Sequence, residues 1–248
     1  MARARPWIVA ILAGLALPGA AMGPVRASDD GACFSIFGAS GPVGELALAR
    51  IAPGRERVSF VRNRDKASPS CPSGGEACRS RAFLVGGDEV VIAKGAGPFV
   101  CASFKSTKGA ETSGWLPLAD LDVFERRAAV RASDVAGLWR RDSEAQIRLS
   151  FEGGRVTVNG EATYGTLDPD RVRRGAVNIG TLEGPARLTR DVVAIGENYD
   201  GSKPAAGMDR AECFARLHLL GRYAVVEDNL GCGGMNVSFT GLYLRVLK

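Results

Sequence analysis

The chain is poor in the groups that most catalytic sites use. It has one histidine, His218, among 248 residues, and no Gly-x-Ser-x-Gly or metalloprotease signature accompanies it. Strand alternation puts His218 on a polar face beside Arg216, which favours a solvated or cross-strand-paired side chain. With its cysteines oxidised, the chain has no free thiol for catalysis. We therefore expect a protein that is not an enzyme and that uses no metal and no cofactor.

Long apolar runs and basic blocks are missing after the first 27 residues. At the N-terminus, Arg3 and Arg5 precede an apolar run at residues 7–17, and Val-Arg-Ala at 25–27 fits a cleavage site. We expect residues 1–27 to be a Sec-type signal peptide cleaved near Ala27, leaving no stable membrane anchor. Its loss would lower the net charge from +5 to +2, which argues against a nucleic-acid partner. The predicted location is periplasmic or secreted.

Four cysteines occupy the first half of the chain, beyond the predicted cleavage site. Cys71 and Cys78 bracket a Pro/Ser/Gly-rich loop at residues 66–79, and this spacing favours a local bridge between them. Cys33 would then pair with Cys101. Four cysteines allow three connectivities, so the two other pairings stay open.

Cys213 and Cys232 are the two remaining cysteines, and they lie near the C-terminus. The glycine-rich stretch around Cys232 lacks the Gly-Lys-Ser/Thr end of a phosphate loop and the paired cysteines of a zinc knuckle. A hairpin turning at Gly221 would bring it level with Cys213. We therefore predict a disulfide that holds this loop at a corner between strands.

Short alternating runs separated by Gly, Pro, Asn and Asp indicate an all-β protein. We predict an N-terminal domain at residues 28–122, a connector at 123–136 and a C-terminal domain at 137–248. About eight strands in the second domain favour an antiparallel β-barrel, which hides strand edges. They include runs at 176–180, 185–188 and 235–247, with a two-residue hairpin turn at Gly153-Gly154.

A Gly-Asp-x-Val turn at residues 87–90 and the run Gly114-Trp115-Leu116-Pro117 carry a resemblance in the first half. Residues 80–124 resemble the back half of a bacterial SH3-like domain. The resemblance implies a small barrel closed by the Trp115 strand. Such domains often bind cell-wall peptides, so peptidoglycan is an expected partner.

A second resemblance lies in the C-terminal half, over residues 137–247. Its strongest pattern is Asp228-Asn229, Cys232-Gly-Gly, Asn236-Val-Ser-Phe, Gly241 and Tyr243. It resembles the lysozyme-inhibitor-like domain of exported proteobacterial proteins, which implies a lysozyme-like protein as partner. The inhibitory loop of the c-type inhibitors, Ser-Gly-x-x-Tyr, has its nearest counterpart in Asn159 to Tyr164, which is one residue longer.

These observations lead to a non-enzymatic binding protein that engages cell-wall material or a wall-cleaving enzyme through loops on a rigid β scaffold. One alternative is a barrel that carries a small apolar ligand. Another is a hydrolase that uses loop carboxylates such as Asp200. The candidate binding residues are Tyr164, Asp200, Asp228, Asn229 and Asn236.

Overall fold

The computed structural model describes residues 32–38, 41–42, 45–124, 130–202 and 208–247. The predicted signal peptide at residues 1–27 and part of the predicted connector lie outside these ranges. Strands make up 52% of the structure and helices 8%, which confirms the all-β prediction. In the described part of the chain, no helix combines the length and the apolar character needed to cross a membrane.

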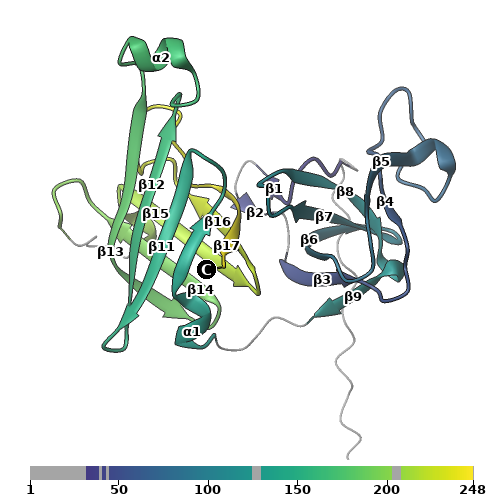
Figure 1. Ribbon diagram of the computed structural model, residues 1–248, viewed down its shortest axis with the longest axis horizontal. Helices are drawn as coiled ribbons and strands as arrows, with labels where there is room; N and C mark the ends of the chain where they lie inside the picture. The colour runs from purple at the N-terminus through teal and green to yellow at the C-terminus, as the bar shows by residue number, and fades with distance from the viewer. Residues whose placement is uncertain (1–31, 39–40, 43–44, 125–129, 203–207, 248) are drawn as a thin grey trace, which may run out of the picture.

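The N-terminal unit is built on one seven-stranded antiparallel sheet, on the right in Figure 1. Two paired strands of two residues each, β1 (Phe37–Gly38) and β2 (Gly41–Pro42), precede it. Two short 3-10 helices, Glu76–Cys78 and Leu118–Asp120, lie between its strands. In spatial order the strands are β5 (Arg79–Leu84), β4 (Val58–Val61), β8 (Glu111–Pro117), β7 (Phe99–Lys105), β6 (Glu89–Ala96), β3 (Ala47–Ile51) and β9 (Leu121–Phe124).

Both faces of this sheet are partly buried. Alternate residues from all seven strands, from Leu84 on one edge to Leu121 on the other, join in one core cluster. The sheet therefore curls around this face. The SH3-like resemblance itself stays a prediction.

The opposite face of the sheet holds Trp115 and two disulfides. Cys33 is bonded to Cys101 and Cys71 to Cys78, which confirms both predicted pairings. All four sulfurs pack in one buried cluster with the Trp115 ring. Cys33–Cys101 thus attaches the N-terminal segment to β7, and Cys71–Cys78 closes the 66–79 loop, whose two sulfurs pack against this sheet face.

The C-terminal unit is a closed eight-stranded antiparallel barrel in which each strand pairs with the next along the chain. β10 pairs with β17 to close it, as the sequence predicts. The strands are β10 (Gly137–Arg140), β11 (Ala145–Glu152), β12 (Arg155–Tyr164), β13 (Asn178–Thr189), β14 (Val192–Glu197), β15 (Cys213–Leu220), β16 (Tyr223–Asp228) and β17 (Gly241–Val246). Helices α1 (Ala132–Val135) and α2 (Pro169–Arg173) and the 3-10 turn Met208–Arg210 lie outside it.

The interior of the barrel is filled by its own side chains. Trp139, Ile147, Leu182, Phe239 and Tyr243 are fully buried members of one cluster to which all eight strands contribute. Gly153 and Gly154 form the predicted two-residue turn, with φ of 57° and 80°. This close packing is the ordinary state of a small eight-stranded barrel.

Two sequence-based boundaries in the barrel are wrong. Residues 176–180 and 185–188 are not separate strands, because β13 runs unbroken through Gly184 and Pro185. Pro185 lies where β13 pairs with β12 but not with β14, a position that tolerates a missing N–H. The predicted strand at 235–247 begins only at Gly241, since residues 235–240 belong to a loop.

The connector also starts later than expected. Residues 121–124 form β9, which pairs with β3 at the edge of the N-terminal sheet. Only Leu121 of this strand is buried, so the sequence shows no clear strand alternation there.

The two units share a buried apolar interface. Ile36, Leu46 and Val91 of the N-terminal unit form one cluster with Tyr223 and Val225 of β16. The Tyr223 hydroxyl donates a hydrogen bond to the backbone oxygen of Glu89 at 2.7 Å. Because Ala224 and Val226 point into the barrel, β16 is buried on both faces.

Replacing Tyr223 with phenylalanine tests this interface. Burial raises the pKa of Tyr223 from 10.0 to about 12, so the folded state keeps this proton where the unfolded state loses it. Stability should fall as pH rises through this window. Tyr223→Phe should cost about 1 kcal/mol of unfolding free energy at neutral pH and make the alkaline decline shallower, as measured by urea unfolding across pH.

Tyr164→Phe is the matched control, because the Tyr164 hydroxyl makes no hydrogen bond with the described residues. This variant should change neither the unfolding free energy at neutral pH nor its decline at alkaline pH. If the unfolding free energies of wild type and Tyr223→Phe fell equally steeply with rising alkaline pH, the raised pKa assigned to Tyr223 would be contradicted.

Candidate functional site

Residues 229–240, here called the plug loop, connect β16 to β17 across one end of the barrel. Gly233 pairs with Gly180 of β13, although β14 and β15 separate β13 from β16 in the barrel. The Gly234 N–H donates to the Ile179 oxygen at 3.1 Å. Val237 and Phe239 then enter the barrel core. The loop therefore covers this opening, which we call the plugged end.

Backbone contact at this point requires glycine. A methyl group on Gly180 would overlap the carbonyl oxygen of Cys232, and one on Gly231 would overlap that of Glu212. The glycines in this stretch thus serve close approach of two backbones. This explains the glycine-rich composition without any phosphate or metal.

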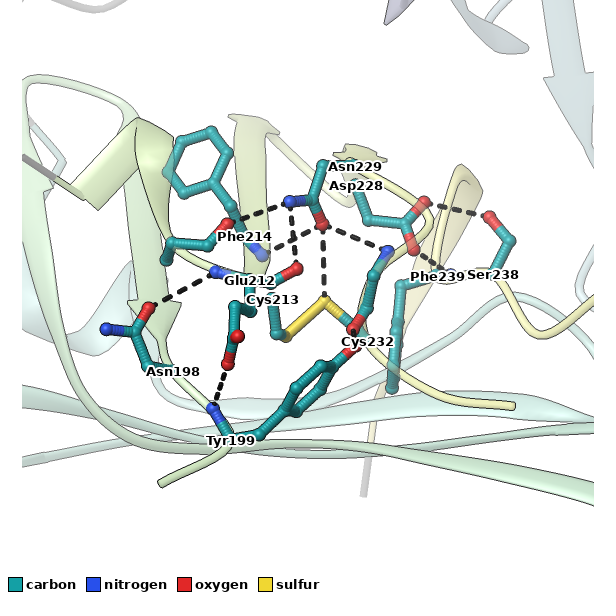
Figure 2. Close-up of a disulfide and its surroundings, with 12 residues drawn as sticks. Asn198, Tyr199, Glu212, Cys213, Phe214, Asp228, Asn229, Cys232, Ser238 and Phe239 are labelled. Atoms are coloured by element: carbon teal, nitrogen blue, oxygen red, sulfur yellow. Dashed lines mark hydrogen bonds between the residues drawn. A yellow bond between two sulfur atoms is a disulfide. The ribbon is translucent and has the colours of Figure 1, made fainter. Parts of the chain in front are cut away.

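The start of the plug loop is fixed by a disulfide and an asparagine, as Figure 2 shows. Cys213 at the beginning of β15 is bonded to Cys232, as predicted. The Asn229 side-chain oxygen accepts hydrogen bonds from the N–H groups of Phe214 at 3.0 Å and Gly231 at 3.1 Å. Its amide nitrogen donates to the backbone oxygens of Ala211 and Glu212, both at 3.1 Å. The loop entry is therefore rigid.

The end of the loop is held by Asp228, the last residue of β16. Its carboxylate accepts hydrogen bonds from the Ser238 hydroxyl at 2.8 Å, the Thr240 hydroxyl at 2.6 Å and the Phe239 N–H at 3.1 Å. Charge-assisted bonds of this kind are stronger than neutral ones. Asp228 and Asn229, both expected to bind a partner, thus hold the plug loop in place.

The other three candidate binding residues also lie at the plugged end. Tyr164 ends β12, and the Arg171 guanidinium lies 4.7 Å from its ring centre. Asp200 is exposed after β14 and accepts from the Ser202 N–H at 2.8 Å. Asn236 is exposed in the plug loop with a φ of 67°. Contact with a partner stays a prediction for all five residues.

Sequence reasoning missed four exposed apolar side chains, two in the plug loop and two beside it. Ile179, Tyr199, Leu230 and Met235, here called the apolar rim, expose 64%, 71%, 68% and 78% of their surface. The Tyr199 hydroxyl donates to the Gly231 oxygen at 2.6 Å, and Asn178 donates to the Met235 oxygen at 2.6 Å. Tyr199 and Leu230 were available signals, as large apolar residues in turn-rich stretches, whereas Ile179 and Met235 fell in predicted strands.

The carboxylates considered for hydrolysis have local structural partners. Asp168 caps α2 by accepting from the N–H groups of Asp170 and Arg171, and Asp170 pairs with Arg173. Hydrogen bonds from Ser202 lower the pKa of Asp200, whereas a general acid needs a raised value. These contacts give no support to a paired-carboxylate mechanism.

His218 and possible metal ligands complete the survey of reactive groups. His218 lies 3.1 Å from the Glu227 carboxylate on the neighbouring strand, which is the cross-strand pairing predicted for it. Among the described residues, no three His, Cys, Asp or Glu side chains come together as a metal site.

No protein-family model, curated protein or solved structure matches this chain. Both resemblances in the sequence therefore stay predictions.

Removing the Asp228 carboxylate should release the end of the plug loop. We expect Asp228→Ala to lower the unfolding free energy by about 3 kcal/mol, because several charge-assisted hydrogen bonds are lost together. Urea unfolding followed by tryptophan fluorescence would measure this loss. Hydrogen exchange should accelerate in residues 229–240 more than elsewhere in the barrel.

Asp200→Ala is the matched control at the same end of the barrel. Its carboxylate is exposed, so this variant should unfold at nearly the same urea concentration as wild type. Similar losses for the two variants would contradict the role assigned to Asp228.

Proposed function

We propose that this protein is a non-enzymatic binding protein of the periplasm or the secreted fraction. Its contact surface is the plugged end of the barrel, and its partner is a wall-cleaving enzyme. Three disulfides support an oxidising compartment.

The apolar rim is the observation that carries this proposal. Scattered exposed apolar residues are common on protein surfaces, but a group of them around one structural feature favours an interaction site. Ile179 and Met235 lie where the plug loop bonds to β13, because their backbone oxygens accept these hydrogen bonds. The Tyr199 hydroxyl bonds to Gly231, the residue after Leu230. Tyrosine and methionine are enriched in protein–protein contacts.

The fixation of the plug loop supports binding through a preformed surface. The loop is tied at its start by Cys213 and Asn229 and at its end by Asp228. A loop that is already ordered loses little conformational entropy when a partner binds. The same residues would therefore serve binding indirectly, by shaping the surface that carries the apolar rim.

The choice of a wall-cleaving enzyme rests on the sequence resemblance. Its strongest pattern, at residues 228–243, coincides with the plug loop and its two anchors. Peptidoglycan itself is the other partner expected from the sequence, through the SH3-like resemblance of the N-terminal unit.

The two alternative functions receive less support. Carriage of an apolar ligand needs interior volume, whereas Trp139, Phe239 and Tyr243 occupy the barrel interior. Hydrolysis needs paired carboxylates with free oxygens, whereas Asp168 and Asp228 are engaged in capping and loop anchoring.

Polar substitutions in the apolar rim should weaken binding of a lysozyme without unfolding the protein. We expect the double variant Leu230→Ser/Met235→Ser to bind at least about tenfold more weakly than wild type, since exposed apolar anchors dominate such contacts. Biolayer interferometry with immobilised lysozymes of several classes would measure affinity, and cell-wall lysis assays would measure inhibition.

Phe151→Ser is the control, because Phe151 lies at the opposite end of the barrel and is 38% exposed. It should bind like wild type. If wild type binds no lysozyme but sediments with purified peptidoglycan, the partner is wall material. If it does neither, the proposed function is wrong.

A further inference from the structure

A cleft of about 1000 Å³ lies between the two units. It borders the plugged end at the β10–β11 turn, where Arg141 bonds to the plug loop. Its N-terminal wall is the β7–β8 loop, and its barrel wall includes the β10–β11 turn, Arg222 and the end of β17. This volume is at the upper end of the range for small-molecule sites. The basic residues that line it are Lys105, Lys108, Arg140, Arg141, Arg222 and Arg245.

Three of these basic residues have fixed internal partners. Arg141 donates to the Asp142 carboxylate at 2.7 Å and to the Ser238 and Thr240 oxygens. Arg245 donates to the Ala136 oxygen. Lys105, whose side chain is only 4% exposed, pairs with Glu111 at 3.5 Å.

The side chains of the other three basic residues, Lys108, Arg140 and Arg222, make no hydrogen bond or ion pair with the described residues. Arg222 lies over the Tyr223 ring at 5.6 Å. All three line the same cleft, although they come from different elements. Their charges are therefore available to a ligand.

The acidic residues of the cleft offset only part of the charge of its basic residues. Three line it: Asp142, Glu144 and Glu161. Asp142 is paired with Arg141, and Glu144 accepts from the Gly165 and Thr166 N–H groups, both at 2.9 Å. Glu144 and Glu161 keep their negative charges, so the six basic and three acidic residues give the lining a formal net charge of +3.

The backbone of two of the cations is held firmly. Arg140 pairs with Leu244 in the ladder that closes the barrel. The Arg222 oxygen accepts from the Arg245 N–H at 2.9 Å, and the adjacent Tyr223 is bonded to Glu89 of the other unit. The backbone from which these two side chains extend is thus in place before any ligand arrives, which favours specific binding.

We propose that this cleft binds a small multivalent anion that carries two or more carboxylate or phosphate groups. Arginine forks and a lysine match both groups. Hydroxyl and amide side chains, including Ser106 and Gln146, line the remaining walls. No aromatic side chain is among the described residues of the lining, so the site lacks the stacking surfaces of nucleic-acid sites.

Isothermal titration of the full mature chain with pyrophosphate and with citrate tests the proposal, with glycerol as the uncharged probe. Wild type should bind at least one anion and not glycerol. Binding of pyrophosphate alone assigns phosphate, and binding of citrate alone assigns carboxylate. Arg140→Gln and Arg222→Gln should each weaken binding about tenfold, the loss expected for one charge-assisted contact.

Arg187→Gln is the matched control, since Arg187 is an exposed residue of β13 and does not line the cleft. It should bind like wild type, as should Leu230→Ser, because Leu230 does not line the cleft. The proposal is overturned if wild type binds neither anion, or if Arg187→Gln loses as much affinity as Arg140→Gln.

Discussion

Burial of β16 on both faces is the constraint on which the arrangement of the two units depends. One face of the strand contributes Ala224 and Val226 to the barrel interior. The other contributes Tyr223 and Val225 to an apolar cluster with the N-terminal sheet. Separating the units would expose this cluster to water. The free-energy cost would be about 25 cal/mol for each Å² of apolar surface exposed.

The two candidate binding surfaces depend on different parts of this framework. The plugged end is shaped within the barrel by Cys213–Cys232, Asn229 and Asp228. The cationic cleft needs both units, because Lys108 comes from the β7–β8 loop of the N-terminal unit and Arg140 from the barrel. A change at the interface would thus alter the cleft, whereas a change at the disulfide would alter the plugged end.

Local signals in the sequence predicted much of the fold and misled at identifiable positions. Alternation and turn residues indicated the barrel strands, and Cys spacing indicated all three disulfides. The Gly184-Pro185 pair suggested a break between two strands. A proline interrupts a strand only where its missing N–H is needed by a neighbouring strand, and β14 does not pair with β13 at this position. Residues 235–240 alternate like a strand because Val237 and Phe239 are buried in the barrel core, yet they belong to the plug loop.

The sequence by itself determined the all-β class, the pairing of nearby cysteines and the stapled corner around Cys232, because these depend on residue patterns over short distances. Only the tertiary structure decided that β16 joins two units, that the corner covers a barrel opening, and that Lys108, Arg140 and Arg222 meet in one cleft. The Tyr223–Glu89 hydrogen bond joins residues 134 positions apart. Contacts at such separations arise from how whole sheets pack, and side-chain alternation along one strand carries no information about which surface will cover it.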